Sequence, residues 1–159
     1  MKIRYCLFLT LTFFSFFCFG QSKGNGANYT FNTKCMGTEL DGSITLEVWG
    51  KGRHYFDALE QAKKNAVRDI IFRGIQDGKC QISAIILSPK AKSTHEEYFA
   101  EFFSDDGPYL EFVSLKDERI LNKMRRNKKK TREMQQRKVV VRVNRLALKK
   151  KLKFDNIIN

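Results

Sequence analysis

The stretch DALEQAKKNAVRDIIFRGI, residues 57–75, is the most regular part of this sequence. It opens with an acidic residue that is followed three positions later by a glutamate, a pattern close to a capping box, and a glycine near its end supplies a stop. Its apolar residues recur at spacings of three and four, as on one side of a helix: Leu59, Ala62, Ala66 and Ile70. We therefore predict one amphipathic helix, about 57–73, whose small alanines let it lie close to a sheet.

Three other segments are typical of β-strands. Residues 42–50, GSITLEVWG, alternate apolar and polar side chains, which indicates a half-buried strand. Residues 81–88, QISAIILS, predict a second strand that ends at a proline. Residues 137–144, RKVVVRVN, predict a third strand from their β-branched alternation. Its expected inward side chains are Val139, Val141 and Val143.

Shorter helices are expected in the second half of the chain. Residues 93–103, STHEEYFAEFF, begin with a capping-box pattern and carry an aromatic side. Asn144 is placed to cap a last helix, RLALKKKLKF. The leucines expected to point inward from that helix are Leu146, Leu148 and Leu152.

Two segments stay ambiguous. Residues 109–113, YLEFV, fit a short helix or a strand, and residues 119–136 fit a hairpin arm or a helix. We favour the hairpin, because no apolar stripe at helical spacing runs through residues 123–138.

This order of elements predicts an α+β domain. We expect a mostly antiparallel, three- to four-stranded sheet with the long helix and shorter helices packed on one face. The domain is expected to cover residues 42–155, after a flexible lead-in over residues 21–41.

The first twenty residues have the layout of a secretory signal. Lys2 and Arg4 precede an uncharged run rich in leucine and phenylalanine, which ends at Gly20 and is followed by a polar segment. A retained anchor is the alternative, but the run is shorter than the ~20 apolar residues that a spanning helix needs. Lipid attachment at Cys18 is not favoured, because two bulky phenylalanines precede it. We expect export to the periplasm or the outer surface of a Gram-negative-type cell.

Removal of this signal would leave two cysteines, Cys35 and Cys80. An oxidising compartment makes them candidates for one disulfide, which would stabilise the domain by roughly 4 kcal/mol through the chain entropy of the unfolded state. The alternative is two free, buried thiols.

The strand end WGKG, the helix DALEQAKKNAVRDIIFRGI and the closing run KVVVRVNRLALKKKL resemble a group of small Gram-negative envelope domains. These include the N-terminal domain of the flagellar protein FlgT and related outer-membrane lipoproteins. The resemblance covers roughly residues 42–75 and 137–153 and rests on structural motifs. It implies an α+β envelope domain with an accessory or assembly role, and it supplies no catalytic residues. The bulky neighbours of Cys18 depart from the lipoprotein members.

The residues offer little for catalysis. His54 fits a helix entry, and His95 lies beside two glutamates on one helix turn, where adjacent positions do not converge on a metal. Asp105 and Asp106 precede a Gly-Pro pair, where aspartate serves the turn. No phosphate loop or dinucleotide motif has its required context. We therefore expect a non-enzymatic protein without a cofactor or a metal.

The charge is concentrated near the end of the chain. Residues 116–159 hold 17 basic and 4 acidic side chains, in a protein whose net charge is +13. A dense positive field attracts polyanions such as lipopolysaccharide phosphates, anionic headgroups, acidic glycans or nucleic acid. No aromatic residue lies within 116–153, so specific nucleic-acid reading is not expected. The alternative is a solvated loop. The candidate polyanion-binding residues are Lys123, Arg125, Arg126, Lys128, Lys129, Lys130, Arg132, Arg137 and Lys138.

A second candidate surface is aromatic. Six rings lie within fifteen residues and would form either part of the core or, if exposed, a patch for a protein partner. They are Tyr98, Phe99, Phe102, Phe103, Tyr109 and Phe112.

Together these features predict an exported cell-envelope accessory or assembly protein that acts through protein contacts. The alternative is a secreted polyanion-binding protein that uses residues 123–138. The expected partners of the protein are an envelope protein or an anionic envelope surface. Any membrane contact after signal removal would be peripheral.

Overall fold

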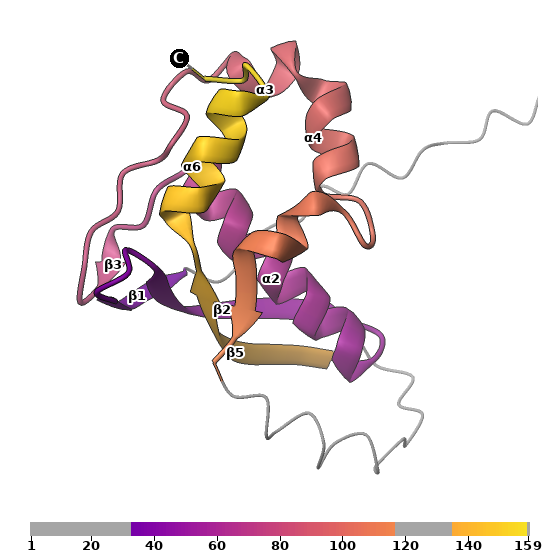
Figure 1. Ribbon diagram of the computed structural model, residues 1–159. Coiled ribbons are helices and arrows are strands. Elements are labelled where there is room, and N and C mark those ends of the chain that lie inside the picture. Colours follow the sequence, from indigo (N-terminus) through magenta and orange to yellow (C-terminus); the bar gives the residue numbers. More distant parts are fainter. Residues whose placement is uncertain (1–32, 117–134, 159) are drawn as a thin grey trace, which may run out of the picture.

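The computed structural model describes residues 33–116 and 135–158 (Figure 1). The predicted signal therefore lies outside the described residues, as does nearly all of the segment expected to form a hairpin or a helix. The strands are β1 (Lys34–Thr38), β2 (Ile44–Gly52), β3 (Asp77–Gly78), β4 (Val113–Leu115) and β5 (Gln135–Val143). The helices are α2 (Tyr55–Phe72), α3 (Ala91–Thr94), α4 (Glu96–Phe102), the 3₁₀ helix η2 (Pro108–Phe112) and α6 (Arg145–Phe154).

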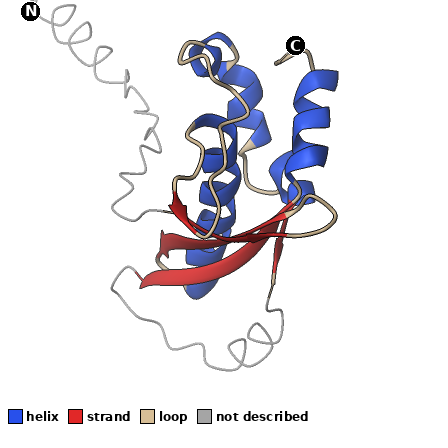
Figure 2. Cartoon of the chain, turned by 90° about the vertical axis from the view of Figure 1, so that its left-hand side faces the viewer, coloured by secondary structure: helices blue, strands red, loops and turns tan. Residues whose placement is uncertain are grey.

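The strands form a single sheet in the order β3-β1-β2-β5-β4. β2 and β5 pair antiparallel along nine residues each, from Ile44 opposite Val143 to Gly52 opposite Gln135. β1 and β4 also pair antiparallel with their neighbours, whereas the two-residue β3 runs parallel to β1. The described helices lie on one side of this sheet (Figure 2).

The α+β class, the long helix and the one-sided arrangement of the helices are confirmed, but the number of strands was underestimated. The sheet has five strands rather than three or four. The additional strand β1, which pairs with β2 on one side and β3 on the other, lies at residues 34–38, within the segment for which a flexible lead-in is predicted. Regular structure is thus present ahead of the alternation at residues 42–50.

The strand predicted at residues 81–88 is not formed. Only Ile82 makes a ladder contact, an isolated bridge to Ile75. The backbone N–H groups of Ile85 and Ile86 instead donate to the carbonyls of residues 70 and 71 in α2, at 3.0 and 2.8 Å. A helix leaves its last carbonyls without intrahelical partners, and here this segment satisfies two of them.

The helix α2 begins two residues earlier than predicted and rests directly on β2. Its entry is secured by the His54 N–H, which donates to the Asp57 carboxylate at 2.9 Å. A Cβ added at Gly50 would lie 1.8 Å from the Ala58 carbonyl oxygen, so no side chain fits between strand and helix at this point. The small residues of both elements therefore set their close separation.

The remaining elements refine the predictions. The helix expected at 93–103 is interrupted at His95, whose ψ of 40° separates α3 from α4. The ambiguous residues 109–113 form the end of η2 and the first residue of β4. β5 forms as predicted, and the Asn144 side chain caps α6 by accepting from the Ala147 N–H at 2.9 Å.

The predicted disulfide is present. It joins Cys35 in β1 to Cys80, which follows β3, across a sequence separation of 45 residues. Cys35 is fully buried in the core, so the bridge ties β1 to the segment that leads from β3 toward α3.

Candidate functional site

Of the nine candidate polyanion-binding residues, only Arg137 and Lys138 lie in the described part of the chain, and both have partners there. The Arg137 guanidinium lies 5.8 Å from the centroid of the Tyr55 ring. The Lys138 ammonium lies 3.2 Å from the Glu47 carboxylate and 6.0 Å from the Trp49 ring centroid. The other seven predicted polyanion-binding residues, at positions 123–132, lie outside the described residues.

The predicted aromatic partner patch is instead mainly core. Phe99, Phe102, Tyr109 and Phe112 are at most 8% exposed, and Tyr98 and Phe103 are half-buried against them. The rings pack in a connected cluster, with Phe102 and Phe112 stacked at 6.2 Å between centroids. Four of the six rings therefore belong to the core, and only Tyr98 and Phe103 remain partly exposed.

One helix face unites charge and apolar surface in a way that the sequence predictions missed. We define the α6 outer face as Leu146, Lys149, Lys150, Lys153 and Phe154. These positions follow the three- and four-residue spacing of one side of a helix. Leu146 and Phe154 are 52% and 83% exposed, and the three lysines are exposed. Leu146 was expected to point inward, and only Leu148 and Leu152 do so.

The lysines of the α6 outer face form no ion pair with any residue that the structure describes. Lys151, on the adjacent side of the helix, behaves differently, because its ammonium lies 2.9 Å from the Asp155 carboxylate. Asp155 also accepts from the Tyr98 hydroxyl at 2.5 Å, and burial together with this carboxylate raises the pKa of Tyr98. The three outer cations are thus available to an external anion.

The α6 outer face adjoins a further exposed leucine. A Cβ added at Gly42, in the turn between β1 and β2, would lie 2.6 Å from the Leu146 Cδ1 atom. The same turn carries Leu40, which is fully exposed. Figure 1 shows α6 continuing directly from β5 at the end of the sheet where this turn lies.

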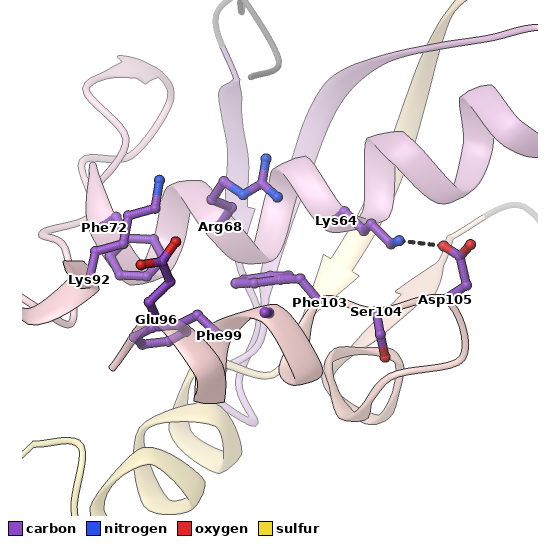
Figure 3. A pocket seen from close by; sticks show the side chains of 10 residues that line it. Lys64, Arg68, Phe72, Lys92, Glu96, Phe99, Phe103, Ser104 and Asp105 are labelled. Atoms are coloured by element: carbon purple, nitrogen blue, oxygen red, sulfur yellow. Dashed lines mark hydrogen bonds and ion pairs between the residues drawn. The ribbon is translucent and has the colours of Figure 1, made fainter. Parts of the chain in front are cut away.

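A second candidate site is the α2–α4 groove, which we define by the ten residues that line it (Figure 3). They come from α2, α3, α4 and the turn that follows α4: Lys64, Arg68, Phe72, Lys92, Glu96, Phe99, Ala100, Phe103, Ser104 and Asp105. The groove has a volume of about 500 Å³. Its floor is a row of rings, with centroids 4.8 Å apart from Phe72 to Phe99 and 6.4 Å apart from Phe99 to Phe103.

The charged residues of the groove are arranged along its length. At one end the Lys64 ammonium lies 2.6 Å from the Asp105 carboxylate, and this hydrogen bond holds the pKa of Asp105 below its usual value. The Arg68 guanidinium lies 5.1 Å from the centroid of the Phe103 ring. Lys92 and Glu96 stand at the other end, both exposed (Figure 3).

The residues considered for catalysis lie apart. His54 precedes α2, His95 separates α3 from α4, and Asp105 and Asp106 occupy the turn after α4. Within residues 33–116 and 135–158, no three histidine, cysteine or acidic side chains are grouped so as to hold a metal ion. Over the same residues, no helix has both the length and the hydropathy required to span a bilayer.

The sequence held a usable signal for the α6 outer face but hardly any for the groove. Residues two apart on a helix point about 200° apart, so Leu146 and Leu148 could not share one side. The groove joins residues that are up to about forty positions apart, and only their tertiary packing reveals it. Comparison with protein-family models, with curated proteins and with solved structures finds no match to this chain.

Proposed function

We propose that this protein is an exported, non-enzymatic accessory domain of a cell envelope that docks on anionic lipid headgroups through the α6 outer face. One observation carries the proposal. Three exposed lysines without an ion-pair partner among the described residues share a helix side with two exposed apolar side chains, Leu146 and Phe154. Such a helix face is typical of proteins that lie at a membrane surface.

The apolar residues favour a lipid surface over a soluble polyanion. The anionic groups of either ligand would attract the lysines, and each lysine near an anionic membrane contributes about 1 kcal/mol. Only a lipid layer also offers an apolar region just below its phosphates, where Leu146 and Phe154 would be buried. Heparin-like glycans and nucleic-acid backbones have no such layer.

Export is supported by two features of the chain. The charged-then-apolar pattern of residues 1–20 favours a secretory signal. The disulfide between Cys35 and Cys80 is consistent with an oxidising extracytoplasmic compartment. An accessory role in envelope assembly fits a domain that would be held at a surface while other faces meet protein partners.

Vesicle co-sedimentation of the chain from Gln21 onward tests this proposal. We expect binding to vesicles of phosphatidylcholine with phosphatidylglycerol and little binding to phosphatidylcholine alone. Lys150→Glu combined with Lys153→Glu should reduce partitioning about ten-fold or more, because two attractive charges become repulsive. The matched control, Lys51→Glu with Arg53→Glu, changes two exposed cations at the opposite end of β2 and should have a much smaller effect.

The apolar contribution is tested separately. Leu146→Ser with Phe154→Ser should weaken vesicle binding but leave binding to heparin unchanged. A soluble polyanion would be favoured by a different result. In that case the double glutamate variant would lose binding to heparin and to vesicles equally, and the double serine variant would bind both normally.

A soluble polyanion is the second candidate, favoured by the excess of basic residues in 116–159. Its site would be the predicted basic segment. Charge reversal at five positions tests it: Arg125, Arg126, Lys128, Lys129 and Lys130. Docking through α6 would be contradicted if this five-fold variant lost anion binding while the double glutamate variant of Lys150 and Lys153 kept full binding.

A further inference from the structure

We propose that the α2–α4 groove binds a small organic acid that combines a flat apolar body with one carboxylate. This site is separate from the α6 outer face, and neither proposal depends on the other. Three features of the groove point to this ligand class: its aromatic floor, its charge balance and its size.

The floor of the groove offers ring faces and edges to an aromatic body, because the Phe72 and Phe99 rings meet at 70° and the Phe99 and Phe103 rings at 24°. Phe72, Phe99 and Phe103 form a row in which neighbouring ring centroids are 4.8 and 6.4 Å apart. Phe72 and Phe103 are only partly buried, so each retains ring surface that a ligand can cover. An aromatic body gains from ring packing in addition to the area that it buries.

The charges of the groove favour a monoanion. Asp105 neutralises Lys64 through a contact of 2.6 Å. Counted together, the lining side chains carry three positive and two negative formal charges, which gives one net positive charge. The Arg68 guanidinium lies 5.1 Å from the centroid of the Phe103 ring, so an anion attracted by the positive lining would place its apolar part over the same row of rings.

The size of the groove agrees with a small ligand. Its volume of about 500 Å³ lies within the range of roughly 300–1,000 Å³ that is common for small-molecule sites. The lining residues come from three helices and a turn, so a compact ligand would contact several elements at once. A bicyclic carboxylate is therefore a suitable probe.

The experiment is a titration of the chain from Gln21 onward with 2-naphthoate, followed by NMR chemical shifts and by calorimetry. The neutral analogue 2-naphthylmethanol has the same body without the charge and should bind more weakly. Shift changes should centre on the residues that line the groove. Equal affinity for the acid and the alcohol would overturn the role of the cations.

Two exposed charges in the groove provide variants with opposite expected signs. Lys92→Gln should weaken 2-naphthoate binding about three- to five-fold, because it removes an attractive charge. Glu96→Gln should strengthen binding by a similar factor, because it removes a repulsive one. Neither side chain is buried, so both variants should fold normally. Changes of the same sign in both variants would contradict the proposal.

A steric variant tests the location. Ala100 is exposed and lines the groove, so Ala100→Trp should fill it and abolish binding without disturbing the core. Undiminished binding in this variant, with its fold verified by circular dichroism, would place the ligand elsewhere. The two proposals can fail separately: Lys92→Gln should leave vesicle binding intact, and Lys150→Glu with Lys153→Glu should leave 2-naphthoate binding intact.

Discussion

At the scale of single residues, Asp69 is the least expected part of the core. It lies on the side of α2 that faces the sheet, and only 3% of it is exposed. One carboxylate oxygen accepts from the Thr33 hydroxyl at 2.5 Å, and the other lies 3.6 Å from the Arg73 guanidinium. Burial is the largest influence and raises the pKa of Asp69, because a low dielectric disfavours the charged form.

This raised pKa predicts a pH-dependent effect of Asp69→Asn on stability. The folded state holds the Asp69 proton more tightly than the unfolded state, whose pKa is about 3.9. The stabilisation from this group is therefore complete below that value and is lost as pH rises through the folded-state pKa. Asparagine cannot ionise, and its carbonyl can still accept from Thr33. The unfolding free energy of the variant relative to the wild type should thus increase from pH 3.5 to pH 7.

Urea denaturation at several pH values measures this difference. Asp105→Asn serves as a control of opposite sign, because the pKa of the exposed Asp105 is lowered by Lys64. Its stabilising contribution is present above the unfolded-state pKa and is lost as pH falls through the folded-state pKa. A relative stability of Asp69→Asn that stays flat or falls with pH would refute the interpretation.

At the scale of elements, the decisive contact is that of α2 with β2. Two glycines of β2 lie beneath the first turns of the helix, and a Cβ at Gly52 would approach the Ala58 nitrogen to 2.5 Å. The helix can approach this closely because neither element presents a large side chain at the crossing. Farther along, Asn65 donates to the Trp49 carbonyl at 2.9 Å, which anchors the helix to the same strand.

Gly50→Ala should therefore destabilise the protein markedly. The new methyl group would overlap the Ala58 carbonyl oxygen, so α2 would have to move away from the sheet. Overpacking of this kind costs about 1–3 kcal/mol and occasionally more. Thermal or urea denaturation measures the loss. Gly37→Ala is the matched control, because a Cβ at Gly37 meets no atom within 4 Å. Comparable losses in the two variants would show that close packing is not the cause.

Helix geometry also explains why Leu146 lies on the α6 outer face and not in the core. Leu148 and Leu152 are four residues apart and share the buried side of the helix. Leu146 then points away from the core, together with Lys150 and Phe154 at the same four-residue spacing. Leu146, two residues before Leu148, lies about 200° away from it around the helix and so cannot share the buried side.

At the scale of the whole molecule, the disulfide fastens the weakest part of the sheet. β3 has two residues, and the segment that follows it is mostly irregular until α3. Without a covalent link, this edge would be held mainly by a short parallel ladder and by the bridge from Ile75 to Ile82.

Replacement of both cysteines by alanine should lower the unfolding free energy by about 4 kcal/mol, as expected for a closed loop of this length in the chain-entropy model. Chemical denaturation of the variant and of the oxidised wild type measures the difference. The reduced wild type should behave like the variant. Identical midpoints for the oxidised and reduced wild type would contradict a stabilising role.

The sequence by itself determined the α+β class, the long helix, β2, β5, the cap at Asn144 and the cysteine pair. These features are local or compositional, since helical and strand periodicity, capping and the number of cysteines can be read within short windows. Tertiary structure alone decided the rest. It added β1 and β3 to the sheet, and it buried most of the aromatic cluster. It also left residues 81–88 without a strand, because the N–H groups of Ile85 and Ile86 donate to carbonyls of α2. It also assembled the α2–α4 groove, since contacts between residues far apart in sequence depend on how the helices pack on the sheet.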